Sequence, residues 1–499
     1  MDILDNLVLG LTVALSLQNL ALCFIGALVG TLIGVLPGLG PTATVAMLLP
    51  ITFYLPPVGA LIMLAGIFYG SQYGGSTTAI LVNIPGESSS VVSCLDGHAM
   101  AMDGRAGSAL AIAALASLFA GVVTTFVIAI AGPALAGVAL MFGPAEYVAL
   151  MVLGLVSATV LTHGSLTKGI AMVVLGILLG NVGTDVNSGQ IRYAFGFPQL
   201  YDGIDFVPLA MGLFGLTEIV ANLEQTQGRG VIASVINRLW PSREDARAAA
   251  PAAVRGTVLG ILLGVLPGGG STLASFAAYT LEKRVSSTPE KFGRGAVQGL
   301  AAPEAANNAA AQAGFIPMLS LGIPPNAIMA LMIGAMTLHG IQPGPLVMTG
   351  QPELFWGMIV SMLIGNIILV VLNLPLIGLW VRLLKVPYDL LFPAILVFCC
   401  IGTYTLRSST FDVAMMALFG VVGYVFRKLE CEPAPLLLGF VLGPMLEENL
   451  QRALLLSQGD LAVFVTRPIS GGLLAATVIL LVLVLLPTVK RGRSEAFRE

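Results

Sequence analysis

Two helix-breaking segments of nearly the same sequence stand 230 residues apart in this chain, each inside an apolar run. Residues 34–42 read GVLPGLGPT, and residues 264–272 read GVLPGGGST. Gly and Pro interrupt a helix, and an interrupted helix at membrane depth is tolerated only where it lines a cavity or is buried in protein. A pair of such breaks in corresponding positions is typical of secondary transporters, which bind their solute there. The duplication therefore predicts a membrane protein that moves a solute.

The composition indicates the same class. The chain has 499 residues, of which 57% are hydrophobic and only 10% charged, and its mean hydropathy is +0.94. Soluble domains carry about 25% charged residues, so the low charge indicates an integral membrane protein. We expect an all-α polytopic membrane protein with about ten to twelve transmembrane helices, some of them broken or re-entrant, because a span needs roughly 20 apolar residues.

Several other classes of protein are disfavoured. The net charge is −3 and the sequence has no basic stripe, so no nucleic-acid partner is expected. The five cysteines show no metal-ligand spacing, and no HExxH, GxSxG or Walker motif occurs. We expect neither an enzyme nor a cofactor. An intramembrane enzyme stays a distant alternative, since Tyr201-Asp202 resembles half of an aspartyl protease pattern.

Two more pairs of segments extend the duplication. The segment from Tyr73, YGGSTTAILVNIPGESS, resembles the segment from Gln312, QAGFIPMLSLGIPPNAI, at an offset of 239 residues. The segment from Ser165 resembles that from Ser408 at an offset of 243 residues. Basic residues switch sides between corresponding loops, for residues 1–30 have none while residues 229–255 have a cluster of arginines. By the positive-inside rule the two repeats should be inverted.

These patterns divide the chain into four parts. The first repeat covers 1–230, with breaks at 34–46 and 69–90, and a basic cytoplasmic linker covers 231–255. The second repeat covers 256–465, with breaks at 264–276 and 303–328. Residues 466–499 give a last transmembrane helix and a basic tail. The tail predicts a cytoplasmic C-terminus, and the N-terminus is expected on the periplasmic side.

Glycines and hydroxyl-bearing residues at the breaks are candidate ligands of an anionic substrate. A helix that restarts after a break presents free N–H groups and a positive dipole end, which bind anions. The candidates are Gly38, Gly40, Thr42, Thr44, Ser76, Thr77 and Asn83 in the first repeat and Gly268, Gly270, Ser271, Thr272, Ser320 and Asn326 in the second. The alternative for the glycines is a packing kink, and for the polar side chains it is interhelical hydrogen bonding.

Glu304 is the best candidate for a carboxylate linked to a coupling cation, because ionisable residues inside a membrane are costly and functional. Glu87 and Glu218 are weaker candidates. The candidate set continues with Asn307, Asn308 and Gln312 on the same segment and with backbone carbonyl groups near Pro37 and Pro267, which can hold Na⁺.

The charge balance of such a site predicts symport with a cation. No Lys or Arg can be placed at the membrane midplane, and two helix N-termini supply about one positive charge. An inside-negative potential opposes the entry of an anion by about 2.3 kcal/mol per charge per 100 mV. Uptake of a di- or tricarboxylate therefore requires co-bound Na⁺ or H⁺.

At these motifs the chain resembles the large membrane subunit of the tripartite tricarboxylate transporters. The resemblance covers essentially the whole chain and is carried by residues 30–50, 69–107, 256–284 and 303–326. It implies a bacterial inner-membrane permease that works with a small membrane subunit and a periplasmic solute-binding protein. It also implies uptake of citrate or related carboxylates driven by Na⁺ or H⁺. A one-component carboxylate symporter is the alternative.

Overall fold

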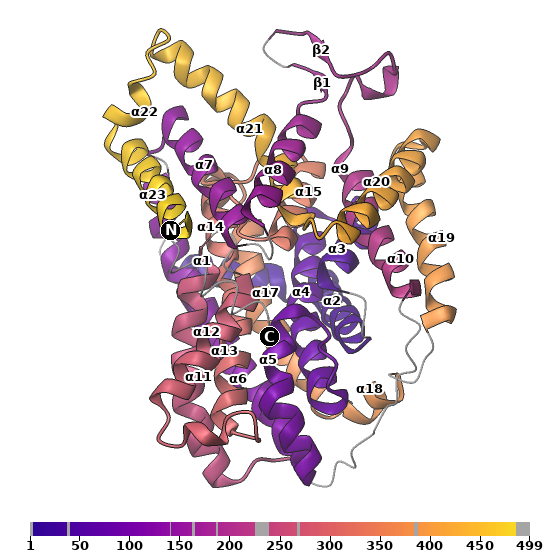
Figure 1. The fold of residues 1–499 in the computed structure, drawn as a ribbon, viewed down its shortest axis with the longest axis vertical. Coiled ribbons are helices and arrows are strands. Elements are labelled where there is room, and N and C mark those ends of the chain that lie inside the picture. The colour runs from indigo at the N-terminus through magenta and orange to yellow at the C-terminus, as the bar shows by residue number, and fades with distance from the viewer. Residues whose placement is uncertain are drawn as a thin grey trace.

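The computed structural model describes residues 3–36, 40–139, 141–161, 165–185, 188–224, 239–266, 270–383 and 388–485. Nearly all of these residues lie in helices (Figure 1). In the described chain the strands are β1 (Gly183–Thr184) and β2 (Ile191–Arg192), which pair antiparallel as a hairpin at one end of the molecule. The predicted all-α class is confirmed.

The helices of the first half are α1 (Ile3–Ala14), α2 (Leu17–Val35), α3 (Pro41–Thr52), α4 (Pro57–Val82), η1 (Ser88–Ser90), α5 (Val91–Ser93), η2 (Cys94–His98), η3 (Ala101–Arg105), α6 (Ala106–Ala139), α7 (Pro144–Leu161), α8 (Leu166–Gly180), η4 (Pro198–Leu200), α9 (Phe206–Ala210), η5 (Met211–Leu216) and α10 (Thr217–Glu224). Those of the second half are α11 (Arg243–Gly264), α12 (Gly270–Val285), η6 (Pro289–Lys291), α13 (Val297–Ala313), α14 (Phe315–Leu321), α15 (Ala327–Leu338), α16 (Leu346–Gly350), α17 (Pro352–Asn373), α18 (Ile377–Leu383), α19 (Tyr388–Arg407), α20 (Thr410–Lys428), α21 (Ala434–Leu456), α22 (Val463–Thr466) and α23 (Pro468–Leu485).

Six helical stretches of the described chain are long and apolar enough to cross a membrane. They are Leu17–Val35, Ala101–Leu135, Phe206–Glu224, Arg243–Gly264, Pro352–Asn373 and Thr410–Lys428. Seven further apolar helices of the described chain are shorter, as expected of a protein in which broken helices count among the ten to twelve spans. The stretch that holds α14 and α15, for example, leaves the helical conformation at Gly322.

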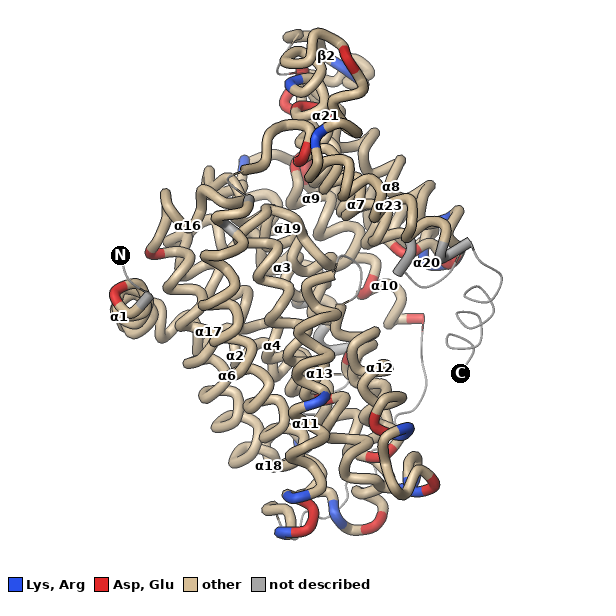
Figure 2. Tube along the Cα trace, turned by 90° about the vertical axis from the view of Figure 1, so that its left-hand side faces the viewer, with Lys and Arg blue, Asp and Glu red and all other residues tan. Residues whose placement is uncertain are grey.

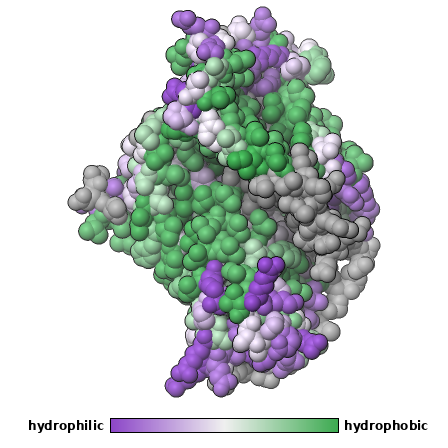
Figure 3. Space-filling model, turned by 60° about the vertical axis from the view of Figure 1, so that its left-hand side comes forward, coloured by the Kyte–Doolittle hydropathy of each residue, from purple (hydrophilic) through white to green (hydrophobic). Residues whose placement is uncertain are grey.

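The surface is organised as a membrane protein requires. Lys, Arg, Asp and Glu gather at the two ends of the molecule and along the side that carries α10 and α20, and a band almost without charge lies between (Figure 2). Figure 3 shows the same band as a hydrophobic belt between hydrophilic ends. Large apolar side chains of α6 and α17, such as Phe126, Ile130 and Val371, are exposed. So extended an apolar surface is unfavourable in water and fits the hydrocarbon of a bilayer.

Glycines bring two pairs of helices into backbone contact. A Cβ atom built at Gly30 of α2 would overlap the carbonyl group of Ile67 in α4, and one built at Gly260 of α11 would overlap that of Ala306 in α13. The glycines repeat every four residues, at Gly26, Gly30 and Gly34 and at Gly256, Gly260 and Gly264. Small residues of this spacing let helices approach closely in membranes. The two contacts correspond residue by residue. Gly260 lies 230 residues after Gly30, and Ala306 lies 239 residues after Ile67, which are the two offsets found in the sequence.

α4 and α14, which end at corresponding positions of the two halves, also end alike. Asn83 follows α4 with φ 56°, and Gly322 follows α14 with φ 72°, so both residues adopt the left-handed conformation. Four residues later, Glu87 and Asn326 share an extended backbone, with φ/ψ of −150°/166° and −151°/173°. Each of these residues precedes the next helical segment. The chain thus makes the same turn twice, 239 residues apart.

Helices that follow the breaks in one half of the chain pack against helices of the other half. α8 of the first half packs against α21 of the second, with Gly176 against Leu436 and Gly439 against Val173. α20 of the second half packs against η5 and α9 of the first.

The segment 231–255, expected to be a linker, differs from the prediction because residues 243–255 form the first half of α11. Ser242 caps this helix, its hydroxyl accepting a hydrogen bond from the N–H of Asp245 at 3.0 Å. Ion pairs of Arg105 with Asp245 at 2.7 Å and of Arg255 with Glu282 at 2.5 Å attach it to its neighbours. Residues 225–238 lie outside the described chain.

Candidate functional site

A cavity of about 780 Å³, here called the main cavity, lies where the interrupted segments of both halves meet. Gly40 and Thr42 at the start of α3 line it, and so do Ser271 and Thr272 at the start of α12. Asn326, which precedes α15, completes this part of the lining. Segments that are far apart in the sequence therefore form one polar site.

The local sequence explains why helices begin at this cavity. Pro41 is the first residue of α3, a position where its missing N–H costs no hydrogen bond. Gly270 has φ 51° at the start of α12, a conformation that glycine adopts without strain. The side-chain oxygen of Asn326 accepts a hydrogen bond from the N–H of Met329 at 2.9 Å and caps α15. The positive dipole ends of α3, α12 and α15 thus all face the cavity region.

Hydrogen bonds connect the two halves beside the main cavity. The hydroxyl groups of Thr272 and Ser88 are hydrogen-bonded at 3.2 Å, which joins α12 to the segment after α4. The amide nitrogen of Asn307 donates to Glu87 Oε1 at 3.4 Å. Ser89 donates to Gln72 Oε1 at 3.0 Å and also contacts the Glu87 carboxylate. Gln72 and Glu87 both line the cavity.

The described lining of the main cavity includes one basic residue. This residue is Arg427, which the sequence did not single out. It lies in the last turn of α20, and it pairs with Glu218 of α10 at 3.2 Å. The sequence could not reveal this position because α20 reaches the cavity only by packing across the halves. The charged lining residues of the described chain are Glu87, Glu218, Glu430, Glu432 and Arg427, so acidic groups are in excess.

The predicted substrate ligands separate into four groups, of which the last, Ser76 and Thr77, lines a second cavity described below. Gly40, Thr42, Gly270, Ser271, Thr272 and Asn326 line the main cavity. Thr44, Asn83 and Ser320 do not: the Thr44 hydroxyl donates to Gly40 O at 3.0 Å, Asn83 ends α4, and the Ser320 hydroxyl donates to Ile316 O at 2.5 Å. Gly38 and Gly268 lie outside the described residues, and so do Pro37 and Pro267, near which backbone carbonyl groups were predicted to hold Na⁺.

Ser76, Thr77 and Glu304 line a second, much smaller cavity of about 10 Å³. The Ser76 hydroxyl donates to Glu304 Oε2 at 2.7 Å, and Ser93 donates to Glu304 Oε1. Glu304 is buried, as are all three polar residues that follow it on α13. Ser76 and Thr77 therefore lie with the predicted coupling carboxylate and not with the other predicted substrate ligands.

The three polar residues after Glu304 on α13 have different neighbours. Asn307 is bonded to Glu87, as described above. The Asn308 amide donates to Ser117 Oγ at 2.7 Å, and the Thr125 hydroxyl donates to Gln312 Oε1 at 3.2 Å. Ser93 and Ser117 were not among the predicted residues, because each comes from a helix whose contact with α13 is tertiary. Gln72 was also missed, although its position one turn before Ser76 on the apolar helix α4 was a usable signal.

The fold and the cavity define a class of protein: a polytopic helical membrane protein in which broken helices enclose a polar site, as in solute transporters. The chain belongs to the tripartite tricarboxylate transporter TctA family, whose model matches residues 20–438. This is a family of transporters, and its name implies a system with further subunits.

Two proteins of Agrobacterium vitis are similar to this chain. An uncharacterized 52.8 kDa protein in the TAR-I ttuC' 3' region is 56% identical over 499 residues, which cover 100% of this chain and 99% of the relative. An uncharacterized protein in the TAR-II ttuC' 3' region is 57% identical over 234 residues, or 47% of this chain and 97% of the relative. No solved structure matches the chain.

Proposed function

We propose that this chain is the permease subunit of a cation-driven uptake system for tricarboxylates or related carboxylates in the bacterial inner membrane. Its partners are a small membrane subunit and a periplasmic solute-binding protein. The observation that carries the proposal is the convergence of the N-termini of α3 and α12, with Asn326, on the main cavity. Free N–H groups at helix starts bind carboxylate groups, and neutral Ser, Thr and Asn side chains orient them.

The charge of the main cavity supports coupling to a cation. Four carboxylates and one guanidinium group line the described part of the cavity. A multiply charged anion entering this site meets an acidic excess, which the helix dipoles offset only in part. A co-bound Na⁺ or H⁺ removes the remaining repulsion. The same cation supplies the driving force against the inside-negative potential.

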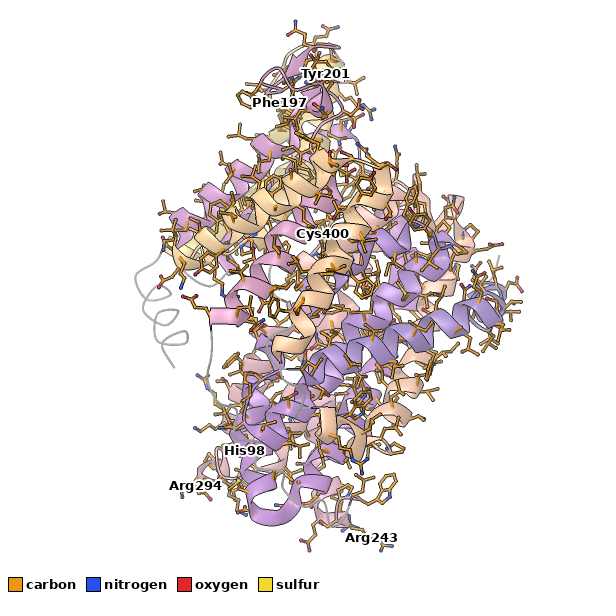
Figure 4. All side chains as sticks on the ribbon, turned by 90° about the vertical axis from the view of Figure 1, so that its right-hand side faces the viewer. His98, Phe197, Tyr201, Arg243, Arg294 and Cys400 are labelled. Atoms are coloured by element: carbon orange, nitrogen blue, oxygen red, sulfur yellow. The ribbon has the colours of Figure 1, made fainter. Side chains whose placement is uncertain are left out.

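The matched contacts of α2 with α4 and of α11 with α13 support two inverted repeats, the architecture that alternating access uses. The orientation follows from the positive-inside rule. Arg243 and Arg294 lie at one end of the molecule, which we assign to the cytoplasm, and Phe197 and Tyr201 lie at the other (Figure 4). The C-terminal tail then lies in the cytoplasm and the N-terminus on the periplasmic side.

Counterflow in proteoliposomes tests the function. Vesicles holding the chain, its small subunit and unlabelled citrate should accumulate external labelled citrate when the binding protein is present. Net uptake into citrate-free vesicles should require an inward Na⁺ or H⁺ gradient. Full uptake without the binding protein would instead support a one-component symporter. Hydrolysis of a substrate without its accumulation would support an enzyme.

A matched pair of threonines tests the main cavity as the substrate site. Thr42→Val removes a hydroxyl that lines the cavity and should raise the KM for the carboxylate by about ten-fold, since a hydrogen bond to a charged group is worth about 1.5–3 kcal/mol. Thr44→Val removes a hydroxyl that is bonded to Gly40 O and should leave the KM unchanged. Equal KM values for both variants would contradict the assignment of the site.

A further inference from the structure

Six of the eleven residues that line the small cavity beside Glu304 carry a side-chain oxygen atom. Tyr73, Ser76, Ser117, Glu304 and Asn373 line it, together with Thr77 and a few apolar side chains. These residues come from α4, α6, α13 and α17, so helices of both halves contribute. The cavity of about 10 Å³ approaches the size needed for one water molecule. It can therefore hold only a single small ligand.

Two lining residues carry buried oxygen atoms without a partner. The hydroxyl of Tyr73 and the amide oxygen of Asn373 form no hydrogen bond, and each residue is only 4% exposed. The Asn373 amide nitrogen is used, since it donates to Leu369 O at 2.9 Å. An unsatisfied buried polar atom costs about 1–3 kcal/mol. Two of them at one small cavity indicate that a ligand with affinity for oxygen completes the site.

The charge of the cavity indicates the sign of that ligand. Glu304 is 1% exposed, and no Lys, Arg or His of the described chain forms an ion pair with it. Its hydrogen bonds come from the neutral hydroxyl groups of Ser76, Ser93 and Ser117. A buried carboxylate without a counter-charge is strongly unfavourable. A monovalent cation would neutralise the site, whereas an anion would double its charge.

We propose that Glu304, Tyr73, Ser76 and Asn373 form a Na⁺ site that is separate from the main cavity. The inference rests on the proposed function, since it names the site of the coupling ion. Carboxylate, hydroxyl and amide oxygens are the ligands that hard cations select. Ser117 lines the same cavity and is held by the Asn308 amide at 2.7 Å.

The position of the site explains how Na⁺ acts on the carboxylate. Gln72 lines the main cavity, whereas Tyr73 and Ser76 on the same stretch of α4 line the small one. On α13, Asn307 is bonded to Glu87 of the main cavity and Asn308 to Ser117 of the small one. A change at the Na⁺ site therefore reaches the substrate site through two shared helices. Such a coupling is reciprocal, so the carboxylate also tightens the binding of Na⁺.

Binding of radioactive Na⁺ to the purified full-length chain in nanodiscs tests the inference. The wild type should bind Na⁺ saturably, and Glu304→Gln should abolish that binding. Tyr73→Phe removes one ligand oxygen at nearly constant shape and should weaken it by about ten-fold. Glu353→Gln is the control, because it neutralises an exposed carboxylate that lines neither cavity and should leave the Na⁺ affinity unchanged. Equal affinity of the wild type and Glu304→Gln, or loss in Glu353→Gln alone, would overturn the site.

Folding must be separated from binding. Each variant is accepted only if it is monodisperse and melts as the wild type does without Na⁺, and Tyr73→Phe supplies the test if Glu304→Gln does not fold. Added Na⁺ should raise the melting temperature of the wild type and of Glu353→Gln, but not of Glu304→Gln. A rise of equal size in Glu304→Gln would overturn the proposal.

Transport distinguishes this inference from the proposed function. Citrate uptake that a Na⁺ gradient drives in the wild type but not in Glu304→Gln supports both. Uptake driven by a pH gradient and indifferent to Na⁺ overturns the Na⁺ site and leaves the permease function intact. Na⁺ binding that depends on Glu304, in a protein that moves no carboxylate, supports the site and overturns the proposed substrate class.

Discussion

At the scale of single residues, the main cavity contains a natural chemical probe. Cys431 lines it, whereas Cys23 and Cys399 are buried elsewhere. A thiol in the substrate site is a target for small reagents, and a bound substrate shields it.

A small methanethiosulfonate reagent should therefore inactivate transport in the wild type, and saturating carboxylate should slow the inactivation. Cys431→Ser should transport normally and resist the reagent, which controls for the other four cysteines. Residual activity is measured as initial uptake against the time of exposure. Inactivation of Cys431→Ser at the rate of the wild type would show that the reagent acts at another residue.

Residues whose place at the cavity is set locally can be chosen from the sequence. Thr42 stands two residues after Gly40 and Ser271 one residue after Gly270, each in the first turn of a helix that starts at the cavity. Arg427 could not be predicted in this way. It lies near the end of α20. Only the packing of this helix against η5 brings Arg427 to a cavity that is formed by distant segments. Thr44 was overpredicted because its hydroxyl bonds the backbone one turn earlier.

At the scale of helices, the glycine contacts of α11 with α13 should dominate stability. Gly260→Val places side-chain atoms against the carbonyl group of Ala306 and should lower the free energy of unfolding by about 1–3 kcal/mol or prevent folding. Gly137→Val on α6 is the control, since a Cβ there meets nothing within 4 Å. Thermal unfolding followed by size-exclusion fluorescence measures the difference. Equal melting temperatures would refute the packing argument.

Breaks in the chain can be expected from the sequence for a physical reason. Gly and Pro act on their own backbone, so the turns at Asn83 and Gly322 could be placed by comparing the two halves of the sequence. The packing of α8 and α20 against helices of the other half could not be predicted, because apolar helix faces in a membrane carry little information about their partner. The beginning of α11 at Arg243 was missed because its charges resemble those of a loop.

At the scale of the molecule, the two ends should lie on opposite sides of the membrane. With the five native cysteines replaced by serine, Phe195→Cys should react with an impermeant maleimide in cells with a permeabilised outer membrane. Arg294→Cys should react only after the inner membrane is opened. Phe195 is 82% exposed and Arg294 is exposed, so access to solvent on each side is not limited by burial. Labelling in the reverse order would invert the proposed orientation.

The glycine contacts between α2 and α4 and between α11 and α13 have a mechanical consequence. Where one backbone touches another, a slide by one residue would bring a side chain against a carbonyl group, so each pair behaves as a rigid body. The path to the solute must then open and close at helix interfaces where bulky side chains, not glycines, meet. A hinge or a sliding interface is expected at those contacts.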